Sequence, residues 1–338
     1  METSVDPVFY FNIYSPVTSL SFCNVPDANT EGQKTLLLIG STNGKVYQWN
    51  IKSRKAENEV DFSPEETGNP ILWLCSIEQD NESFLAVQQR FSDKICLIKY
   101  SNYTWTQKKM LVLSDKHSGF CKGDLSLDDK LVFPCGENSF VMAKLIKGDS
   151  EELQSASSVV KTEGCGTLMA LKFNFFKKKQ CVFSLYENGD ILLHSVVESN
   201  NEFIISTLTK YQSLQSTPLS IDFDSDKCKG IVGGSEDNIT SFELVENNDK
   251  IVINLLKTRK TPTKGISSII IRPDKKIVVA GSWDSTVKLF SWLHPEKLKP
   301  LGALKFHSEG IEDIVITSDS KLIAAGSKDG KISFWNVY

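Results

Sequence analysis

Apolar and polar positions along this chain alternate in short blocks, without the spacing of a helical stripe. The last 34 residues show this most clearly. Two apolar runs, 311–316 and 322–325, are separated by a polar turn at 317–321, and a third apolar run, 332–337, follows a second turn at 326–330. Apolar runs of this length between turn residues are typical of buried β-strands. This segment therefore predicts a small antiparallel sheet.

The same block of strands and turns recurs along the chain. An Asn or Asp marks the turn after the second strand of each block, at Asn43, Asp93, Asn138, Asn188, Asp237, Asp284 and Asp329. Consecutive marks are 45 to 50 residues apart. A period of this length is typical of propellers, in which each repeat is one sheet that packs on its neighbours. The seven marks predict an all-β, seven-bladed propeller.

The turn chemistry of the last block resembles that of a WD40 repeat, with Trp335-Asn336 in place of the usual Trp-Asp. This resemblance implies a buried hydrogen-bonded chain of four side chains, formed here by His307, Ser327, Asp329 and Trp335. Each of these polar groups needs a partner when buried, and a chain supplies one. A Ser-His-Asp hydrolase triad is the alternative. We favour the structural interpretation because each residue occupies a position that a blade requires.

The whole chain, residues 1–338, is expected to form this single propeller. Its blades are predicted at 15–62, 69–114, 119–160, 168–211, 218–260, 265–307 and 310–338. The last blade contains only three strands, so the aromatic run Pro7–Tyr14 is predicted to add the fourth and close the ring. In the third blade the first strand is expected at 120–127, whereas no fourth strand is evident and 148–166 is expected to hold a loop.

Composition excludes several classes of function. The net charge is −4 and the chain has only four arginines, which disfavours direct nucleic-acid binding. Eight cysteines without a Cys-x-x-Cys pair indicate free thiols in a reducing compartment, the cytoplasm or the nucleus. No segment suits a membrane span or a signal peptide. The segment Gly40–Lys45 is one residue short of a phosphate-binding loop, and Val46 replaces its Ser or Thr.

Several segments are similar to the G-protein β-subunit-like protein 1 family, whose fungal counterpart is ASTRA-associated protein 1. They are 221–225 (IDFDS), 271–274 (IRPD), 283–284 (WD), 290–292 (FSW), 306–308 (FHS) and 324–329 (AAGSKD). The similarity is strong from Pro218 onward and thin between Asn50 and Thr217. It implies a non-enzymatic adaptor of the Tel2-Tti1-Tti2 co-chaperone complex, which supports the phosphatidylinositol-3-kinase-related kinases.

A heterotrimeric G-protein β role is not expected. That role requires a long N-terminal helix that forms a coiled coil with a γ subunit. Here only six residues precede Pro7, and the first patterned run is of the β type. We therefore expect no γ-subunit partner.

The residues before the turn marks are expected to face one flat end of the ring, where a partner protein can bind. The candidate partner-binding residues are Trp283, Lys328, Thr42, Glu187 and Glu236. An exposed Trp is a frequent hot spot at interfaces. Alternatively, Trp283 packs sideways on the next blade or on the loop above it.

Two other functions compete with the adaptor. A chromatin reader would hold a histone or other peptide on the flat end, and Glu137, Glu187 and Glu236 supply acidic groups there. An enzyme would gather carboxylates or metal-binding histidines at the central channel, but the chain has four scattered histidines. We therefore expect no catalysis, no metal and no cofactor.

Overall fold

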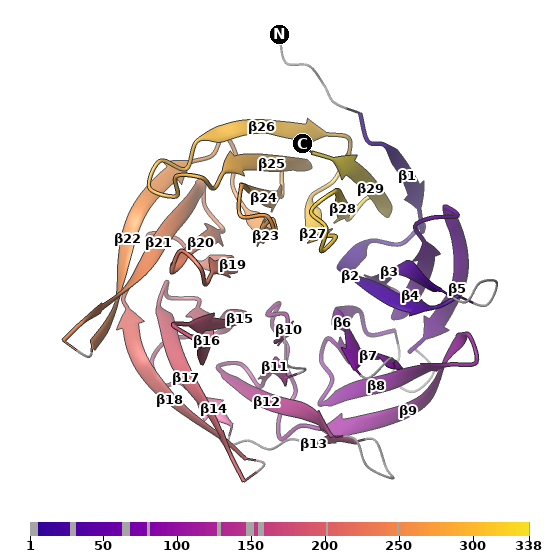
Figure 1. The fold of residues 1–338 in the computed structure, drawn as a ribbon, viewed down its shortest axis with the longest axis horizontal. Helices are drawn as coiled ribbons and strands as arrows, with labels where there is room; N and C mark the ends of the chain where they lie inside the picture. The colour runs from indigo at the N-terminus through magenta and orange to yellow at the C-terminus, as the bar shows by residue number, and fades with distance from the viewer. Residues whose placement is uncertain are drawn as a thin grey trace.

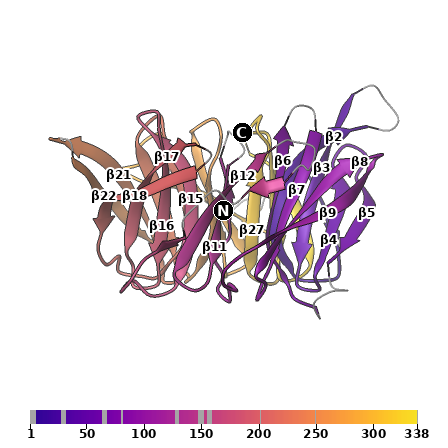
Figure 2. The ribbon, with the colours of Figure 1, turned by 90° about the horizontal axis from the view of Figure 1, so that it is seen from below.

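The computed structural model describes residues 6–27, 32–62, 68–79, 82–126, 130–146, 152–154, 159–200, 202–248 and 250–337. These residues form strands and no helix, and hence no helix able to cross a membrane. Their seven sheets stand around a central axis (Figure 1). Figure 2 shows the ring from its side, with neighbouring sheets next to one another. The predicted all-β, seven-bladed propeller is confirmed.

Five blades share one four-stranded antiparallel order, in which the first strand is innermost. They are β2 (Val17–Pro26), β3 (Gln33–Ser41), β4 (Lys45–Asn50) and β5 (Lys55–Asp61); β6 (Ile71–Gln79), β7 (Glu82–Gln89), β8 (Lys94–Ser101) and β9 (Thr104–Val112); β15 (Leu168–Phe176), β16 (Lys179–Tyr186), β17 (Ile191–Ser199) and β18 (Glu202–Tyr211); β19 (Pro218–Asp224), β20 (Lys229–Gly234), β21 (Asn238–Asn247) and β22 (Lys250–Lys260); and β23 (Ile266–Ile271), β24 (Ile277–Ser282), β25 (Thr286–Ser291) and β26 (Pro300–Lys305). These are blades one, two, four, five and six.

Blade seven contains β27 (Ile311–Ile316), β28 (Leu322–Ser327) and β29 (Lys331–Asn336), and the N-terminal strand β1 (Phe9–Asn12) pairs with β29. Figure 1 shows β1 beside β29 at the outer edge of this blade. Phe9 stacks on Phe334 of the last blade, and Phe11 stacks on Trp49 of blade one at 3.6 Å between ring centroids. The N-terminal strand therefore joins the first and last blades, as the sequence predicts.

The hydrophobic core lies between the blades. Each of seven clusters of buried apolar side chains takes its members mainly from two neighbouring blades, so each inter-blade interface has its own cluster. Blades six and seven share the cluster that contains Trp335, which is 1% exposed. Strands that are covered on both faces need apolar residues on both. This explains why the inner strands are short, nearly continuous apolar runs.

Carboxylates on the innermost strands link neighbouring blades. Asp313 Oδ2 accepts a hydrogen bond from the Leu20 N–H (2.8 Å), which connects blade seven to blade one. Asp124 accepts from the Phe173 N–H in the same way, and Asp222 accepts from the Ile271 N–H. Hydrogen bonds to a charged acceptor are stronger than neutral ones. They fix the height of one blade against the next around the channel.

Blade three departs from this plan. Its innermost strand, β10 (Asp124–Leu125), has two residues, and the expected strand 120–127 is wrong for 120–123, which are not strand, while Leu127 lies outside the described residues. Next come β11 (Lys130–Cys135) and β12 (Ser139–Ile146). The outer strand is split into β13 (Glu152–Gln154) and β14 (Val160–Lys161), which pair with opposite ends of β12.

A close packing contact lies just before the short inner strand. The Trp73 indole of blade two lies directly against Gly123, where a Cβ atom would fall 2.7 Å from the ring. The position therefore suits glycine. The residues before Asp124 form a loop.

Candidate functional site

One end of the ring is formed by the turns between the second and third strands of the blades and by the loops that enter the first strands. We call this end the turn face. In six blades the residue that follows the second strand donates its N–H to the carbonyl of the residue before the first strand, at 2.8–3.0 Å. These six equivalent residues are Thr42, Arg90, Glu187, Ser235, Trp283 and Lys328. The hydrogen bond thus identifies the same surface position in each of these blades.

This equivalence corrects two positions from the sequence analysis. In blade five the equivalent residue is Ser235, and Glu236 follows it. The reason is that Asp237 lies one position later in its turn than Asp329 does. The Asp237 carbonyl accepts from the Thr261 N–H, the role that Gly330 has for the Ile13 N–H in blade seven.

In blade two the equivalent residue is Arg90, which the sequence analysis missed. That turn is one residue longer, so counting back from Asp93 leads to Ser92 instead. An Arg-Phe pair within a polar turn was the available signal in the sequence.

Trp283 lies on the turn face with 46% of its surface exposed. One side of its indole covers Gly265, where a Cβ atom would fall 2.1 Å from the ring. Gly265 also has a φ of +82°, a conformation that suits glycine. The ring therefore rests on the loop that enters its own blade, and its remaining surface faces solvent.

Two lysines flank Trp283 along the turn face. Lys264 precedes Gly265 in the chain, and its Nζ lies 2.7 Å from Glu236 Oε2. The hydrogen bond that Lys264 donates to Glu236 raises the pKa of Lys264, so this lysine stays charged. On the other side, the backbone of Trp283 contacts Gly310, whose carbonyl accepts from the Lys328 N–H.

The Lys328 Nζ lies 3.2 Å from Glu312 Oε1. Along the turn face Trp283 therefore lies between two lysine residues, each of which is paired with one glutamate. We call Glu236, Lys264, Trp283, Lys328 and Glu312 the Trp283 strip. Exposed ion pairs of this kind contribute about 0–1 kcal/mol, so an incoming partner can replace them at small cost.

The other two candidate residues belong to blades outside this strip, although blade one is the neighbour of blade seven. Thr42 belongs to blade one and is half-buried, with its Oγ1 3.4 Å from Ser15 Oγ. Glu187 belongs to blade four and is exposed, with one carboxylate oxygen 3.4 Å from the Thr167 N–H. Among the described residues no hydrogen bond or ion pair joins either one to the Trp283 strip. The structure therefore brings together Trp283, Lys328 and Glu236 of the five candidates.

A buried hydrogen-bonded chain is present in blade seven, but its hydroxyl group comes from Ser333. His307 Nδ1 lies 3.2 Å from both carboxylate oxygens of Asp329. His307 Nε2 lies 2.8 Å from Ser333 Oγ, which also accepts a hydrogen bond from Trp335 Nε1 at 2.8 Å. Ser333 and Trp335 are two residues apart on β29, so their side chains leave the same face of the strand.

The assignment of Ser327 to this chain is wrong. Ser327 Oγ donates to the Glu309 carbonyl and accepts from the Asp329 N–H, so it stabilises the turn instead. Burial alone would raise the pKa of Asp329. Hydrogen bonds from His307 and from the backbone N–H groups of Ser308 and Lys331 outweigh burial and hold this pKa well below its usual range. The four linked groups hold the turn and loop at this end of the blade, which is a structural role.

Comparison with known proteins agrees with this geometry. The family model described as "WD domain, G-beta repeat" matches residues 253–291 and 298–336, the regions of blades five to seven that include Trp283 and the whole hydrogen-bonded chain. The guanine nucleotide-binding protein subunit beta-like protein 1 of Mus musculus is 28% identical over 305 residues, which cover 87% of this chain and 84% of the relative. The chain therefore contains WD40 repeats and is similar to this relative over most of its length.

In this WD40 protein the acidic groups of the central channel are paired with lysines. Lys122 enters from blade three, and its Nζ lies 3.1 Å from Asp313 of blade seven. Lys172 lies 3.5 Å from Asp124 and 3.3 Å from Asp222. Burial acts to lower the pKa of Lys172, but the two carboxylates more than offset it and the pKa is raised. The channel is therefore close to neutral, which does not favour the acidic cup expected of a histone reader.

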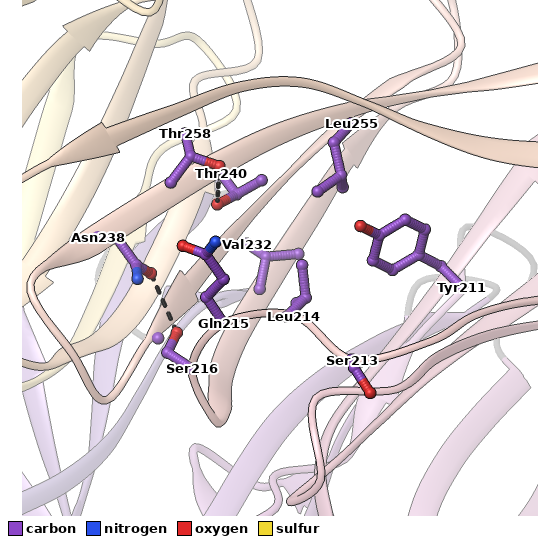
Figure 3. A pocket seen from close by; sticks show the side chains of 11 residues that line it. Tyr211, Ser213, Leu214, Gln215, Ser216, Val232, Asn238, Thr240, Leu255 and Thr258 are labelled. Carbon is purple, nitrogen blue, oxygen red and sulfur yellow. Dashed lines mark hydrogen bonds between the residues drawn. The ribbon is translucent and has the colours of Figure 1, made fainter.

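The described residues of this WD40 protein contain no cluster of three or more His, Cys, Asp or Glu side chains that could hold a metal ion. A hollow of about 260 Å³ lies between blades four and five (Figure 3). Its lining is neutral and rich in hydroxyl and amide groups. Ser216 is hydrogen-bonded to Asn238, and Thr240 is hydrogen-bonded to Thr258. In Figure 3 the Tyr211 hydroxyl and the Gln215 amide point into the space. The hollow contains no charged side chain and no acid–base pair.

Proposed function

We propose that this WD40 protein is a non-catalytic scaffold that binds a partner protein through the Trp283 strip, as an adaptor of the Tel2-Tti1-Tti2 co-chaperone system. The observation that carries the scaffold role is the half-exposed Trp283 ring, held on Gly265 between two lysines. The resemblance to the β-subunit-like protein 1 family supports the choice of partner. The clients would then be the phosphatidylinositol-3-kinase-related kinases.

The physical argument for an interface starts from the cost of the exposed ring. A half-exposed Trp leaves a large apolar surface in water, and covering it would release about 25 cal/mol for each Å² buried. Hot spots at interfaces are enriched in Trp and are surrounded by polar groups that exclude water. The Trp283 strip has this arrangement, with the lysines and glutamates as its rim. A rigid support also reduces the entropy lost on binding.

The proposal also includes the cellular compartment in which the protein acts. All eight cysteines are free, and six of them are buried. Free thiols in a packed core suit a reducing compartment. We therefore place the protein in the cytoplasm, the nucleus or both.

The test is co-purification from cells that express the tagged full-length chain. We expect Trp283→Ala to lose Tel2, Tti1 and Tti2, while its melting temperature stays within about 2 °C of the unmodified protein because the ring is half-exposed. Tyr103→Ala is the matched control, because Tyr103 is an exposed aromatic residue in the turn between β8 and β9, at the other end of the ring. It should keep the partners.

Two results would contradict the proposal. Equal recovery of the co-chaperone subunits with Trp283→Ala and with the unmodified chain would remove the strip from the interface. Recovery of histones in place of co-chaperone subunits would favour the chromatin-reader alternative.

A further inference from the structure

A second cluster of exposed aromatic residues lies on the turn face, in blades two and three. The Arg90 guanidinium lies over the Phe120 ring, 4.0 Å from its centroid, and 4.8 Å from the centroid of Phe91. Phe120 is 65% exposed and Phe91 is 45% exposed. Arg90 occupies the position in blade two that Trp283 occupies in blade six. Two phenyl rings and a cation thus face solvent together.

The cluster is held in place by the loop that precedes blade three. Arg90 Nε donates to the Ser118 carbonyl at 3.0 Å, and the Phe91 N–H donates to the His117 carbonyl at 3.0 Å. The buried His117 has its Nδ1 2.6 Å from the Gly136 carbonyl, so it ties the loop to the turn of blade three. Burial lowers the pKa of His117, which keeps the ring neutral. The arrangement is therefore formed before any ligand arrives.

The guanidinium retains free hydrogen-bond donors. In the described part of the chain, Nε is the only guanidinium nitrogen of Arg90 with a hydrogen-bond partner. The two terminal nitrogens carry four N–H groups in one plane, a fork that matches the two oxygens of a carboxylate. Arg272 shows the contrast, because its Nε and both terminal nitrogens bond to Asp274 and to the Val337 carbonyl.

We propose that Arg90, Phe91 and Phe120 form a second peptide-binding site, for a linear segment in which an Asp or Glu lies next to an apolar residue. The Arg90 fork binds the carboxylate, and the two rings cover the apolar side chain. Charge complementarity selects the acidic partner, because the free donors carry a positive charge. This site goes beyond the proposed function, since it lies away from the Trp283 strip and takes a different ligand.

The test measures binding of a fluorescent probe to the purified full-length chain by anisotropy. The probe is a labelled peptide of alternating Glu and Leu with blocked ends, and the matched probe has Gln in place of each Glu. We expect the Glu peptide to bind at least about tenfold more tightly than the Gln peptide, because a carboxylate paired with Arg is a charge-assisted bidentate contact. The salt concentration is kept the same for both.

Three variants locate the site. Arg90→Lys keeps the charge but removes the fork, and should weaken binding of the Glu peptide by about tenfold. Phe120→Ser alters a side chain that is mostly exposed, so it should weaken binding several-fold without a change in melting temperature. Trp283→Ala should leave the affinity for this peptide unchanged.

Three outcomes would overturn the inference. The first is equal affinity for the Glu and Gln peptides. The second is unchanged binding in both Arg90→Lys and Phe120→Ser, with each variant shown to be folded by its melting curve. The third is loss of peptide binding in Trp283→Ala alone, which would assign the acidic peptide to the Trp283 strip and leave the proposed adaptor function intact.

Discussion

Blades seven and three have a histidine at the same place, in the loop that enters the blade, but they use it differently. In blade seven, His307 bonds to Asp329 and to Ser333, and the sheet has four continuous strands. In blade three, the His117 ring bonds only to the Gly136 carbonyl, and its Nε2 is buried without a partner among the described residues. The pairing of the strands places Val141 where Ser333 lies in blade seven. The two histidines therefore differ at both ring nitrogens, because His117 lacks the carboxylate partner at Nδ1 and the hydroxyl partner at Nε2.

The two ways of fixing the entry loop have different consequences for stability and for the surface that the blade presents. Blade seven fixes its loop with buried side chains, which leaves a regular and recognisable repeat. Blade three fixes its loop mainly through backbone carbonyls, and the same loop displays Phe120 beside Arg90. Loops held on a rigid scaffold are common places for binding residues. The irregular blade thus provides a second surface, away from the Trp283 strip.

The largest expected effect comes from disrupting the buried hydrogen-bonded chain of side chains in blade seven. Trp335→Ala removes a side chain that is 1% exposed together with its hydrogen bond to Ser333, so it should lower the free energy of unfolding by about 3–5 kcal/mol. Urea denaturation followed by tryptophan fluorescence or circular dichroism measures this loss. Trp283→Ala is the matched control and should cost under about 1 kcal/mol. A loss under about 1 kcal/mol for Trp335→Ala would show that the chain does not hold this blade.

A second comparison separates the two serines of blade seven. Ser333→Ala removes the shared partner of His307 Nε2 and Trp335 Nε1, and each buried group left unpaired costs about 1–3 kcal/mol. We expect a loss of about 2–4 kcal/mol. Ser327→Ala removes only turn hydrogen bonds and should cost about 1 kcal/mol. A larger loss for Ser327→Ala would restore Ser327 to the hydrogen-bonded chain.

The interface between blades three and four should respond to acid. The buried His194 packs edge-on against Phe140, and burial lowers its pKa to about 4. The unfolded chain holds a proton on this residue below about pH 6.5, whereas the folded chain does not until about pH 4, so stability falls as the pH drops through that range. At pH 5 the loss from His194 is about 2 kcal/mol.

The measurement is urea denaturation at pH 7 and at pH 5. His194→Gln should reduce the difference in unfolding free energy between the two pH values. A pH dependence that is the same in this variant and in the unmodified chain would show that another group titrates.

The repeat pattern was sufficient to predict the ring, the number of blades and the closing strand. These features depend on apolar runs and turn residues that are close in the sequence, such as those of 311–337. The role of Ser333 could not be predicted in the same way. Ser327 and Ser333 flank one tight turn, and only the three-dimensional pairing of β28 with β29 shows which hydroxyl group reaches His307.

Among the surface residues, too, some could be found from the sequence and others could not. Trp283 was singled out because a Trp in a turn is unusual, and the structure places it half-exposed, while its role in binding stays a prediction. Arg90 and Phe120 are 30 positions apart and meet because the loop before blade three folds back over the turn of blade two. Such a contact depends on tertiary packing and leaves no local pattern.

The variant with the smallest expected effect makes blade three more like blade seven. Val141→Thr places a hydroxyl group at the position of Ser333, where it can pair with His117 Nε2. Burying a hydroxyl group without a partner costs about 1–3 kcal/mol, and pairing two buried groups offsets most of that cost. We therefore expect Val141→Thr to change the unfolding free energy by under about 1 kcal/mol. Val132→Thr, in the neighbouring strand β11, is the control and should lose the full amount. Equal losses in the two variants would show that the His117 nitrogen and residue 141 do not meet.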